Sequence, residues 1–447
     1  MLRFPDGFLW GTASASYQVE GAVDADGRGE TIWDRFCRTP GKVTNGDTGD
    51  VACDHYNRSA EDVALMKRLA MRGYRFSIAW SRIFPEGRGK ASRAGLDFYN
   101  RLVDQLLAAG IAPAVTLYHW DLPQALQDAG GWENRDTASY FVDFADRMFG
   151  ALGDRVKFWI THNEPWVVAF VGNYMGHHAP GKTDFSTAVR VAHTLLVSHA
   201  RTVNLFRQDH PRSGRIGITL NLAPCYPQSD ADEDAARRAD GYQNRWFLDP
   251  VFRGWYPKDM LDLYAAKGVL AGVDEGDRDL FASAKVDFLG VNYYSRHVSC
   301  RAAVQPLEVA QSVPAGAPVT EMGWEIYPEG LYDLLKRIDR DYGKPELYIT
   351  ENGAAFKDED VRDGVVQDGD RLDYLRRHFE QAHRVIADGV RLKGYFVWSL
   401  MDNFEWAHGY SRLFGIVRCD YATQARTPKQ SGLWFGRVAE ANAVPEE

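Results

Sequence analysis

The chain has 447 residues, of which 45% are hydrophobic and 25% charged, a composition typical of a globular protein and not of a disordered or fibrous one. The formal net charge is −9 and no run rich in Lys and Arg occurs, which disfavours a nucleic-acid partner. The 13 Trp, 21 Tyr and 23 Phe supply many flat apolar faces, which suit either a packed core or stacking against a ligand ring.

The cysteines indicate a reducing compartment. They are odd in number and widely scattered, and no C-x-x-C pair suggests zinc or redox chemistry. The first residues, M-L-R-F-P-D-G-F-L-W-G, lack the apolar stretch of a signal peptide, and no run approaches the roughly 18 apolar residues of a membrane span. We therefore expect a cytoplasmic protein without a membrane partner. The five cysteines are Cys37, Cys53, Cys225, Cys300 and Cys419.

Eight short runs rich in β-branched and aromatic residues recur along the chain, and each is followed by a longer segment with helical spacing of apolar residues. This alternation predicts eight β-strands that are separated by helices. The eight runs are Phe8 to Ser16, Tyr74 to Trp80, Ala112 to His119, Lys157 to Glu164, Arg215 to Leu222, Asp287 to Ser295, Glu346 to Glu351 and Leu392 to Leu400.

The segment Ser59 to Arg72 illustrates the helical pattern. Ser59 followed by Asp62 resembles a capping box, which predicts a helix that begins at Ser59. Gly73 and Gly110 lie just before strands, where a glycine in the left-handed conformation would end a helix and turn the chain back into the sheet.

Eight alternations without a break in composition favour one closed parallel barrel over an open, doubly wound sheet. We expect a single (β/α)8 TIM barrel domain over residues 1–447. Two of the connections after strands are long, namely residues 20–54 and 296–327. In such a barrel these βα loops wall the mouth of the active site.

Two carboxylates lie where catalytic groups of a barrel are expected, at the C-terminal ends of strands. The fourth strand ends in W-I-T-H-N-E-P, which contains Glu164, and the seventh ends in L-Y-I-T-E-N-G, which contains Glu351. These strands lie almost across the barrel from one another. Two carboxyl groups that face each other over a central pocket have the arrangement that glycoside hydrolysis requires.

Ordered motifs along essentially the whole chain resemble those of glycoside hydrolase family 1, the β-glucosidases and their relatives. Each motif alone could occur by chance, but the ordered set could not. The motifs are F-P-D-G-F-L-W-G-T-A-S-A-S-Y-Q-V-E-G at Phe4 to Gly21, Y-R-F-S-I-A-W-S-R-I-F-P at Tyr74 to Pro85, Y-H-W-D-L-P at Tyr118 to Pro123, T-H-N-E-P at Thr161 to Pro165, G-V-N-Y-Y-S at Gly290 to Ser295, I-T-E-N-G at Ile349 to Gly353 and V-W-S-L-M-D-N-F-E-W at Val397 to Trp406.

The resemblance implies a β-glucosidase that retains the anomeric configuration by double displacement, with some β-galactosidase or β-fucosidase activity. It makes Glu164 the acid/base and Glu351 the nucleophile, and two carboxyls roughly 5 to 5.5 Å apart cannot both ionise cheaply, so Glu164 should have the raised pKa. Arg75 and Tyr294 are implied as partners that keep Glu351 ionised. Asn163 is implied to bind the sugar 2-hydroxyl.

The resemblance also implies a set of sugar contacts. Amide and carboxylate groups would hold the hydroxyls, and indole rings would stack on the apolar face of the sugar. Trp398 is the implied floor and Trp324 the implied platform for the aglycone, and the bond between Trp398 and Ser399 matches a cis position. The implied contacts to the glycone are Gln18, His119, Trp120, Asn163, Asn292, Tyr294, Trp398, Glu405 and Trp406.

Other functions remain open on the same scaffold. A 6-phospho-β-glycosidase would need a cationic cradle where F-E-W stands, and Glu405 would repel the phosphate. A silent sugar-binding module would be expected to lack one of the carboxylates, and a metal-dependent hydrolase lacks a ligand set. The aglycone is also open, and it can be cellobiose, a plant glucoside or a lipid-like group. The sequence does not fix whether the chain forms a homo-oligomer.

The remaining residues of chemical interest favour structural roles. His177 and His178 are adjacent in G-H-H-A-P-G without a third ligand, so we interpret them as loop residues and expect no metal and no cofactor. Trp33, Trp80 and Trp159 are expected in the core, because only their residue type suggests a site. The predicted partners are small β-glycosides or cello-oligosaccharides.

Overall fold

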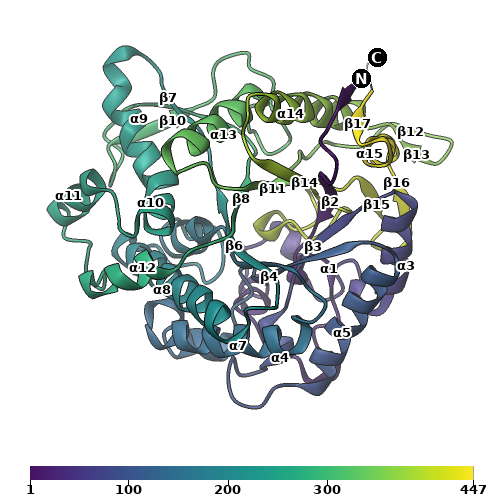
Figure 1. Cartoon of the computed structure of the whole chain (residues 1–447), viewed down its shortest axis with the longest axis horizontal. Helices are drawn as coiled ribbons and strands as arrows, with labels where there is room; N and C mark the ends of the chain where they lie inside the picture. The colour runs from purple at the N-terminus through teal and green to yellow at the C-terminus, as the bar shows by residue number, and fades with distance from the viewer. Residues whose placement is uncertain (446–447) are drawn as a thin grey trace.

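The computed structural model describes residues 1–445, in which eight parallel strands close into a barrel (Figure 1). Each predicted run overlaps one of these strands, and only β3 and β11 extend beyond their runs, by one residue each, so the predicted (β/α)8 barrel is confirmed. In hydrogen-bonding order the strands are β11 (Leu347–Asn352), β14 (Leu392–Trp398), β2 (Leu9–Ala13), β3 (Gly73–Ser77), β4 (Ala112–Tyr118), β5 (Phe158–Asn163), β6 (Arg215–Asn221) and β8 (Phe288–Asn292).

The barrel strands are buried on both faces, as strands covered by helices outside and by a packed interior must be. In β3 all five residues are buried. Phenylalanine rings fill the interior, where Phe158 stacks on Phe288 at 4.1 Å between ring centroids. Gly11 accommodates this packing, because a Cβ atom there would lie 2.7 Å from the ring of Phe396.

Helices surround the barrel in Figure 1, and their apolar faces pack on the outside of the strands. The helices of the described chain, including short ones in the βα loops, are α1 (Ser16–Val19), α2 (Ile32–Cys37), α3 (His55–Arg68), α4 (Trp80–Ile83), α5 (Arg93–Ala108), α6 (Gln124–Asp128), α7 (Asp136–Leu152), α8 (Phe185–Asp209), α9 (Glu233–Asp240), α10 (Trp246–Arg253), α11 (Lys258–Ala266), α12 (Arg278–Ser283), α13 (Glu329–Asp341), α14 (Gly369–Ala387) and α15 (Gln430–Ala441).

Two local predictions need correction. Helix α3 begins at His55, but Arg58 is non-helical (φ −115°), so the regular helix starts after it, at the predicted Ser59. Asp62 does not act as a cap partner, because its carboxylate accepts hydrogen bonds from His55 and Arg426. Gly110 has the predicted positive φ of 76°, but Gly73 is already the first residue of β3, and the turn that precedes it is made by Ala70 at φ 55°.

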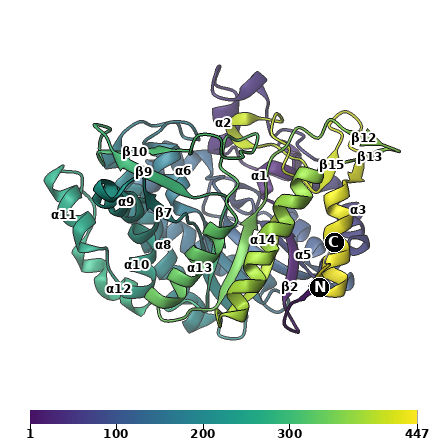
Figure 2. The ribbon, with the colours of Figure 1, turned by 90° about the horizontal axis from the view of Figure 1, so that it is seen from above.

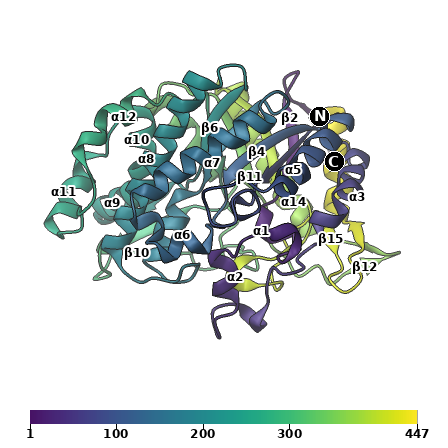
Figure 3. The same cartoon turned by 90° about the horizontal axis from the view of Figure 1, so that it is seen from below.

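The long βα loops gather at one end of the barrel, along one edge of the molecule in Figures 2 and 3. The loop over residues 20–54 contains α2, and the loop over residues 296–327 contains a two-stranded ladder. The two ends of the described chain lie side by side and pair through β1 and β17. The remaining strands are β1 (Leu2–Arg3), β7 (Cys225–Pro227), β9 (His297–Arg301), β10 (Val309–Ser312), β12 (Val361–Arg362), β13 (Val365–Val366), β15 (Val417–Cys419), β16 (Arg426–Pro428) and β17 (Ala443–Val444).

The predicted core tryptophans Trp33, Trp80 and Trp159 are all fully buried. Their burial confirms that they belong to the packing. Over residues 1–445, none of the helices combines the length and the apolar character that crossing a bilayer requires.

Candidate active site

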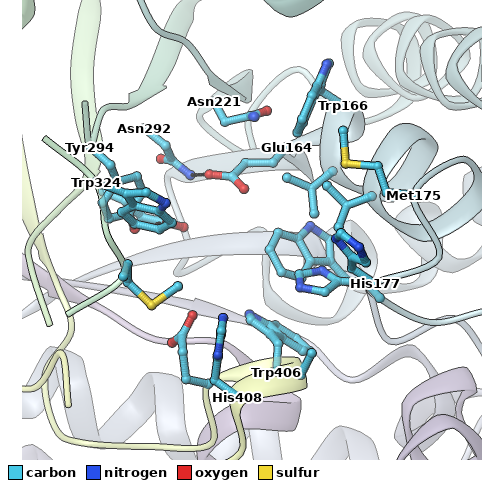
Figure 4. A pocket seen from close by; sticks show the side chains of 18 of the residues that line it. Glu164, Trp166, Met175, His177, Asn221, Asn292, Tyr294, Trp324, Trp406 and His408 are labelled. Atoms are coloured by element: carbon cyan, nitrogen blue, oxygen red, sulfur yellow. Dashed lines mark hydrogen bonds between the residues drawn. The ribbon is translucent and has the colours of Figure 1, made fainter. Parts of the chain in front are cut away.

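A cavity of about 790 Å³ opens at the end of the barrel where the long loops gather (Figure 4). Ten of the thirteen predicted site residues line it, whereas Gln18, Arg75 and Asn163 lie beneath its surface. The strands end at this cavity, so their C-terminal residues point into it. The ten are His119, Trp120, Glu164, Asn292, Tyr294, Trp324, Glu351, Trp398, Glu405 and Trp406.

Both carboxylate oxygens of Glu351 accept hydrogen bonds from side chains. Arg75 Nη1 donates to Oε1 at 2.5 Å, and the Tyr294 hydroxyl donates to Oε2 at 2.7 Å. The guanidinium of Arg75 is itself fixed, since Nε donates to Thr116 and Nη1 also donates to the carbonyl of Thr350. These contacts hold Glu351 in one orientation at the end of β11.

Glu164 has fewer partners. Its Oε1 accepts a side-chain hydrogen bond from Asn292 Nδ2 at 2.6 Å, which Figure 4 shows. The residue directly follows β5 and adopts a φ of 48°, which turns the chain out of the strand. Its backbone N–H donates to Thr219 on the next strand.

The environments of the two carboxyls separate their pKa values. Burial and the charge of Glu351 hold the pKa of Glu164 well above its ordinary value. Burial also raises the pKa of Glu351, but the Arg75 cation and the Tyr294 hydroxyl lower it. Glu351 therefore loses its proton first, and Glu164 keeps its proton beside the anion.

An amide network joins the two carboxyls beneath the cavity. Asn163 Oδ1 accepts from Arg75 Nη2 at 2.6 Å and from Asn292 Nδ2 at 3.0 Å, and its Nδ2 lies 3.0 Å from His119 Nε2. Asn292 Oδ1 accepts from Thr350. These contacts fix the amide orientations before any ligand enters.

Several buried polar atoms of the cavity have no protein partner in the described chain. They include Gln18 Oε1 and His119 Nδ1. Gln18 Nε2, in contrast, donates to Asn403 and to Glu405 Oε2. Burial holds the pKa of His119 well below its ordinary value, so the ring is neutral. Asn163 Nδ2 donates to His119 Nε2, so the neutral ring carries its proton on Nδ1, which is a donor, whereas Gln18 Oε1 is an acceptor. Unpaired buried polar groups are costly, and ligand hydroxyls would satisfy both kinds.

Glu405 differs from the expectation of a charged carboxylate. Burial, together with the charge of Glu351, raises the pKa of Glu405 to about 8. The side chain is therefore mostly protonated at neutral pH. Glu405 would therefore repel a phosphate less than the sequence suggested. A phosphate would still find little positive charge, because Lys42 is the only Lys or Arg among the cavity-lining residues of the described chain.

Indole rings form the floor and walls of the cavity. Trp398 lies beside His119, with 5.8 Å between ring centroids and 23° between planes, and its bond to Ser399 is cis as the resemblance implied. Trp120 packs on Trp406 at 4.6 Å. The Trp120 Nε1 group donates to the backbone carbonyl of Asn163, so this residue presents its ring and not its N–H group to the cavity.

The sequence did not identify the outer lining of the cavity. His177 and His178, interpreted as plain loop residues, both line it, as does Trp166, which directly follows the T-H-N-E-P motif. That adjacency was the one available signal. The other lining residues outside the prediction include Lys42, Val167, Val171, Met175, Asn221, Leu222, Gln243, His297, Met322, His408 and Phe414.

The side chains of the described residues form no cluster that could hold a metal ion. Within residues 1–445, no group of three or more His, Cys, Asp or Glu residues could hold a metal ion. All five cysteines are free in the same range.

A family model described as glycosyl hydrolase family 1 matches residues 1–444. Among curated proteins, the chain is 51% identical to a β-glucosidase A of Acetivibrio thermocellus and 51% identical to a β-glucosidase A of Thermotoga maritima, with 99% of both chains covered in each case. It is 44% identical to a bifunctional β-D-glucosidase/β-D-fucosidase of Bifidobacterium breve over 98% of this chain and 99% of that one.

The fold is also similar to those of solved structures with about the same sequence identity. A family 1 β-glucosidase from Thermotoga maritima superposes with a TM-score of 0.95 at 50% identity, and all of both chains is covered. The same score and coverage apply to that enzyme in complex with noeuromycin.

Proposed function

As a member of glycosyl hydrolase family 1, the chain is a retaining β-glucosidase, and we propose that Glu351 is its nucleophile and Glu164 its general acid/base. The observation that carries the assignment is the asymmetry of the two carboxyls. Glu351 is held as an anion by Arg75 and Tyr294, whereas burial beside that anion keeps Glu164 protonated.

In the first step an oxygen of Glu351 attacks the anomeric carbon while the bond to the aglycone breaks. The proton of Glu164 passes to the departing oxygen. Glu351 is then an ester and has lost its charge, so the pKa of Glu164 falls and its carboxylate can act as a base. It takes a proton from water as the water oxygen attacks the anomeric carbon, which releases the sugar and regenerates the Glu351 carboxylate.

We infer that the glycone is a terminal non-reducing β-D-glucosyl residue above Trp398. The unpaired Gln18 Oε1 and His119 Nδ1 support this assignment, because a polyol hydroxyl can donate to the amide oxygen and can accept from the Nδ1–H group. Glu405 at a pKa of about 8 can donate or accept a hydrogen bond. We also propose some β-galactosidase or β-fucosidase activity, since these sugars differ from glucose by the direction or presence of single hydroxyls, which Gln18, His119 and Glu405 can accommodate.

We further propose that the protein acts in the cytoplasm as a single domain on small β-glycosides or cello-oligosaccharides. The free cysteines support the location, and the hydrophobic core that runs from Phe4 to Val444 supports the single domain. A role in the degradation of cellulose fragments follows from relatives named 1,4-β-D-glucan glucohydrolase.

The test is hydrolysis of an aryl β-glucoside and an aryl β-galactoside by the wild type, Glu164→Ala and Glu351→Gly, with azide added to each variant. We expect azide to rescue Glu351→Gly with an α-glycosyl azide as product, and Glu164→Ala with a β-glycosyl azide. The opposite pairing would reverse the assignment. Failure of the wild type on both substrates would favour a phosphorylated sugar or a silent binder.

A further inference from the structure

The outer part of the cavity contains one cation, Lys42, and no carboxylate, and burial keeps the pKa values of its His178, His297 and His408 below their ordinary value. Every acidic residue that lines the cavity in the described chain is Glu164, Glu351 or Glu405, and all three belong to the glycone end. The outer cavity, which we define by Lys42, Trp166, His177, His178, His297, Met322, Trp324, His408 and Phe414, has one lysine, four histidines and no carboxylate. This contrasts with the net charge of −9 of the whole chain.

Lys42 is the permanent cation of this region. Its side chain is exposed and lines the cavity. Its ammonium lies over the Phe36 ring at 5.6 Å and beside Gly181, where a Cβ atom would be 3.6 Å away. The loop that contains Lys42, over residues 20–54, contacts the loop that follows β14, because Thr44 Oγ1 donates a hydrogen bond to the carbonyl of Ala407 at 3.2 Å.

The neighbouring rings offer hydrogen-bonding atoms that the protein does not use. His178 Nδ1 and Trp166 Nε1 are buried without a partner in the described chain. Burial, with the nearby His408 and His177, lowers the pKa of His178 to about 3, so its ring is neutral. An uncharged imidazole and an indole N–H can form hydrogen bonds with neutral polar groups of a ligand, while a negatively charged group of the same ligand pairs with Lys42.

The opposite side of the outer cavity is flat and apolar. Trp324 lies 5.2 Å from the Tyr294 ring and 6.2 Å from the Phe414 ring, measured between centroids. In Figure 4, Tyr294 and Trp324 stand across the cavity from His177. A planar aglycone can therefore pack on Trp324 while a polar substituent reaches the basic side.

We propose that the outer cavity selects aglycones that join a flat aromatic ring to an anionic group, so that the favoured substrates are β-glucosides of phenolic acids. The ring packs on Trp324 and the carboxylate lies at Lys42. This inference rests on the proposed function, because it assigns the aglycone of the same reaction. A neutral sugar aglycone would use the same apolar wall but would gain nothing from the cation.

The test compares 4-carboxyphenyl β-D-glucoside with its neutral analogue 4-carbamoylphenyl β-D-glucoside. The measured quantity is the ratio of the two kcat/KM values, because effects of a variant on the shared chemistry cancel in it. We expect Lys42→Met to lower this ratio about fivefold relative to the wild type, the upper range for a partly exposed charge pair. Lys42→Glu should lower it further, and added salt should lower it in the wild type only.

The matched control is Lys393→Met, which makes the same charge change at the start of β14, at the opposite end of the barrel. Its ratio should equal that of the wild type. Equal ratios in the wild type, Lys42→Met and Lys42→Glu would overturn the inference while the β-glucosidase assignment stands. Absence of hydrolysis of the neutral glucoside by the wild type would instead remove the proposed function itself.

Discussion

The hydrogen bond from the Tyr294 hydroxyl to Glu351 offers a direct test of how the site keeps its nucleophile ionised. The bond is 2.7 Å long, and Glu351 is 4% exposed. A hydrogen bond to a charged group contributes about 1.5–3 kcal/mol, and 1.36 kcal/mol corresponds to one pKa unit. Tyr294→Phe should therefore raise the pKa of Glu351 by about one to two units.

The sign of the effect on activity follows from the roles of the two groups. The reaction needs Glu351 ionised and Glu164 protonated, so the acidic limb of kcat/KM against pH reports the ionisation of Glu351 in the free enzyme. The variant should move that limb to higher pH. On the acidic side kcat/KM should fall about 10- to 100-fold, with a smaller loss near the optimum.

The assay is the pH profile of kcat/KM on an aryl β-glucoside for the wild type and Tyr294→Phe. Tyr293→Phe serves as the control, because the neighbouring hydroxyl is also buried but donates to the backbone carbonyl of Tyr327. Its acidic limb should stay in place. An acidic limb of Tyr294→Phe that is unchanged, or that moves to lower pH, would refute the reasoning.

Three further predictions concern single side chains. Glu405→Gln should lower kcat/KM but raise the thermal midpoint of unfolding, and it should raise it more at pH 8 than at pH 5. A carboxyl whose pKa is about 8 in the folded protein destabilises the fold increasingly as the pH rises above the ordinary pKa of a carboxyl. Equal gains at both pH values in calorimetry would contradict this. Arg75→Met should lower kcat/KM roughly 100-fold, and Arg75→Lys should restore only part of this loss. A single ammonium group cannot reproduce the guanidinium contacts to Glu351, Thr116 and the amide network. Full restoration by Arg75→Lys would show that the positive charge alone matters. Trp159→Ala should lower the free energy of unfolding by about 3–5 kcal/mol in denaturant titrations with little change in the activity of folded protein, and a loss below about 1 kcal/mol would contradict its place in the core.

Local patterns in the sequence were sufficient to predict the fold and to place Glu164 and Glu351 at one cavity. Short runs rich in β-branched and aromatic residues, in alternation with helical spacing, located all eight barrel strands, since such composition is a property of short segments. A parallel barrel then brings the C-terminal ends of its strands to one face, so Glu164 and Glu351 had to meet at one cavity once the strands were assigned. The motifs around them were enough to indicate the family, which the family model confirms.

The partners of Asp62 and the lining of the outer cavity were decided only in three dimensions. Asp62 resembled part of a helix cap in the sequence, but Arg426 lies 364 residues away and takes its carboxylate into an ion pair. His177 and His178 looked like plain loop residues until the loop folded over the cavity. Contacts between loops of different strands have no local signature.

The sequence by itself was sufficient to predict the barrel, the two carboxyls that meet at its cavity and the chemical class of the reaction. The tertiary structure decided the protonation of Glu405, the use of the Trp120 N–H group by the backbone and the basic outer cavity. Each of these depends on burial and on neighbours far along the chain, such as Gln18 and Glu405, which are 387 residues apart. Burial and electrostatic interactions are properties of distance in space, and residue order specifies that distance only through the completed fold.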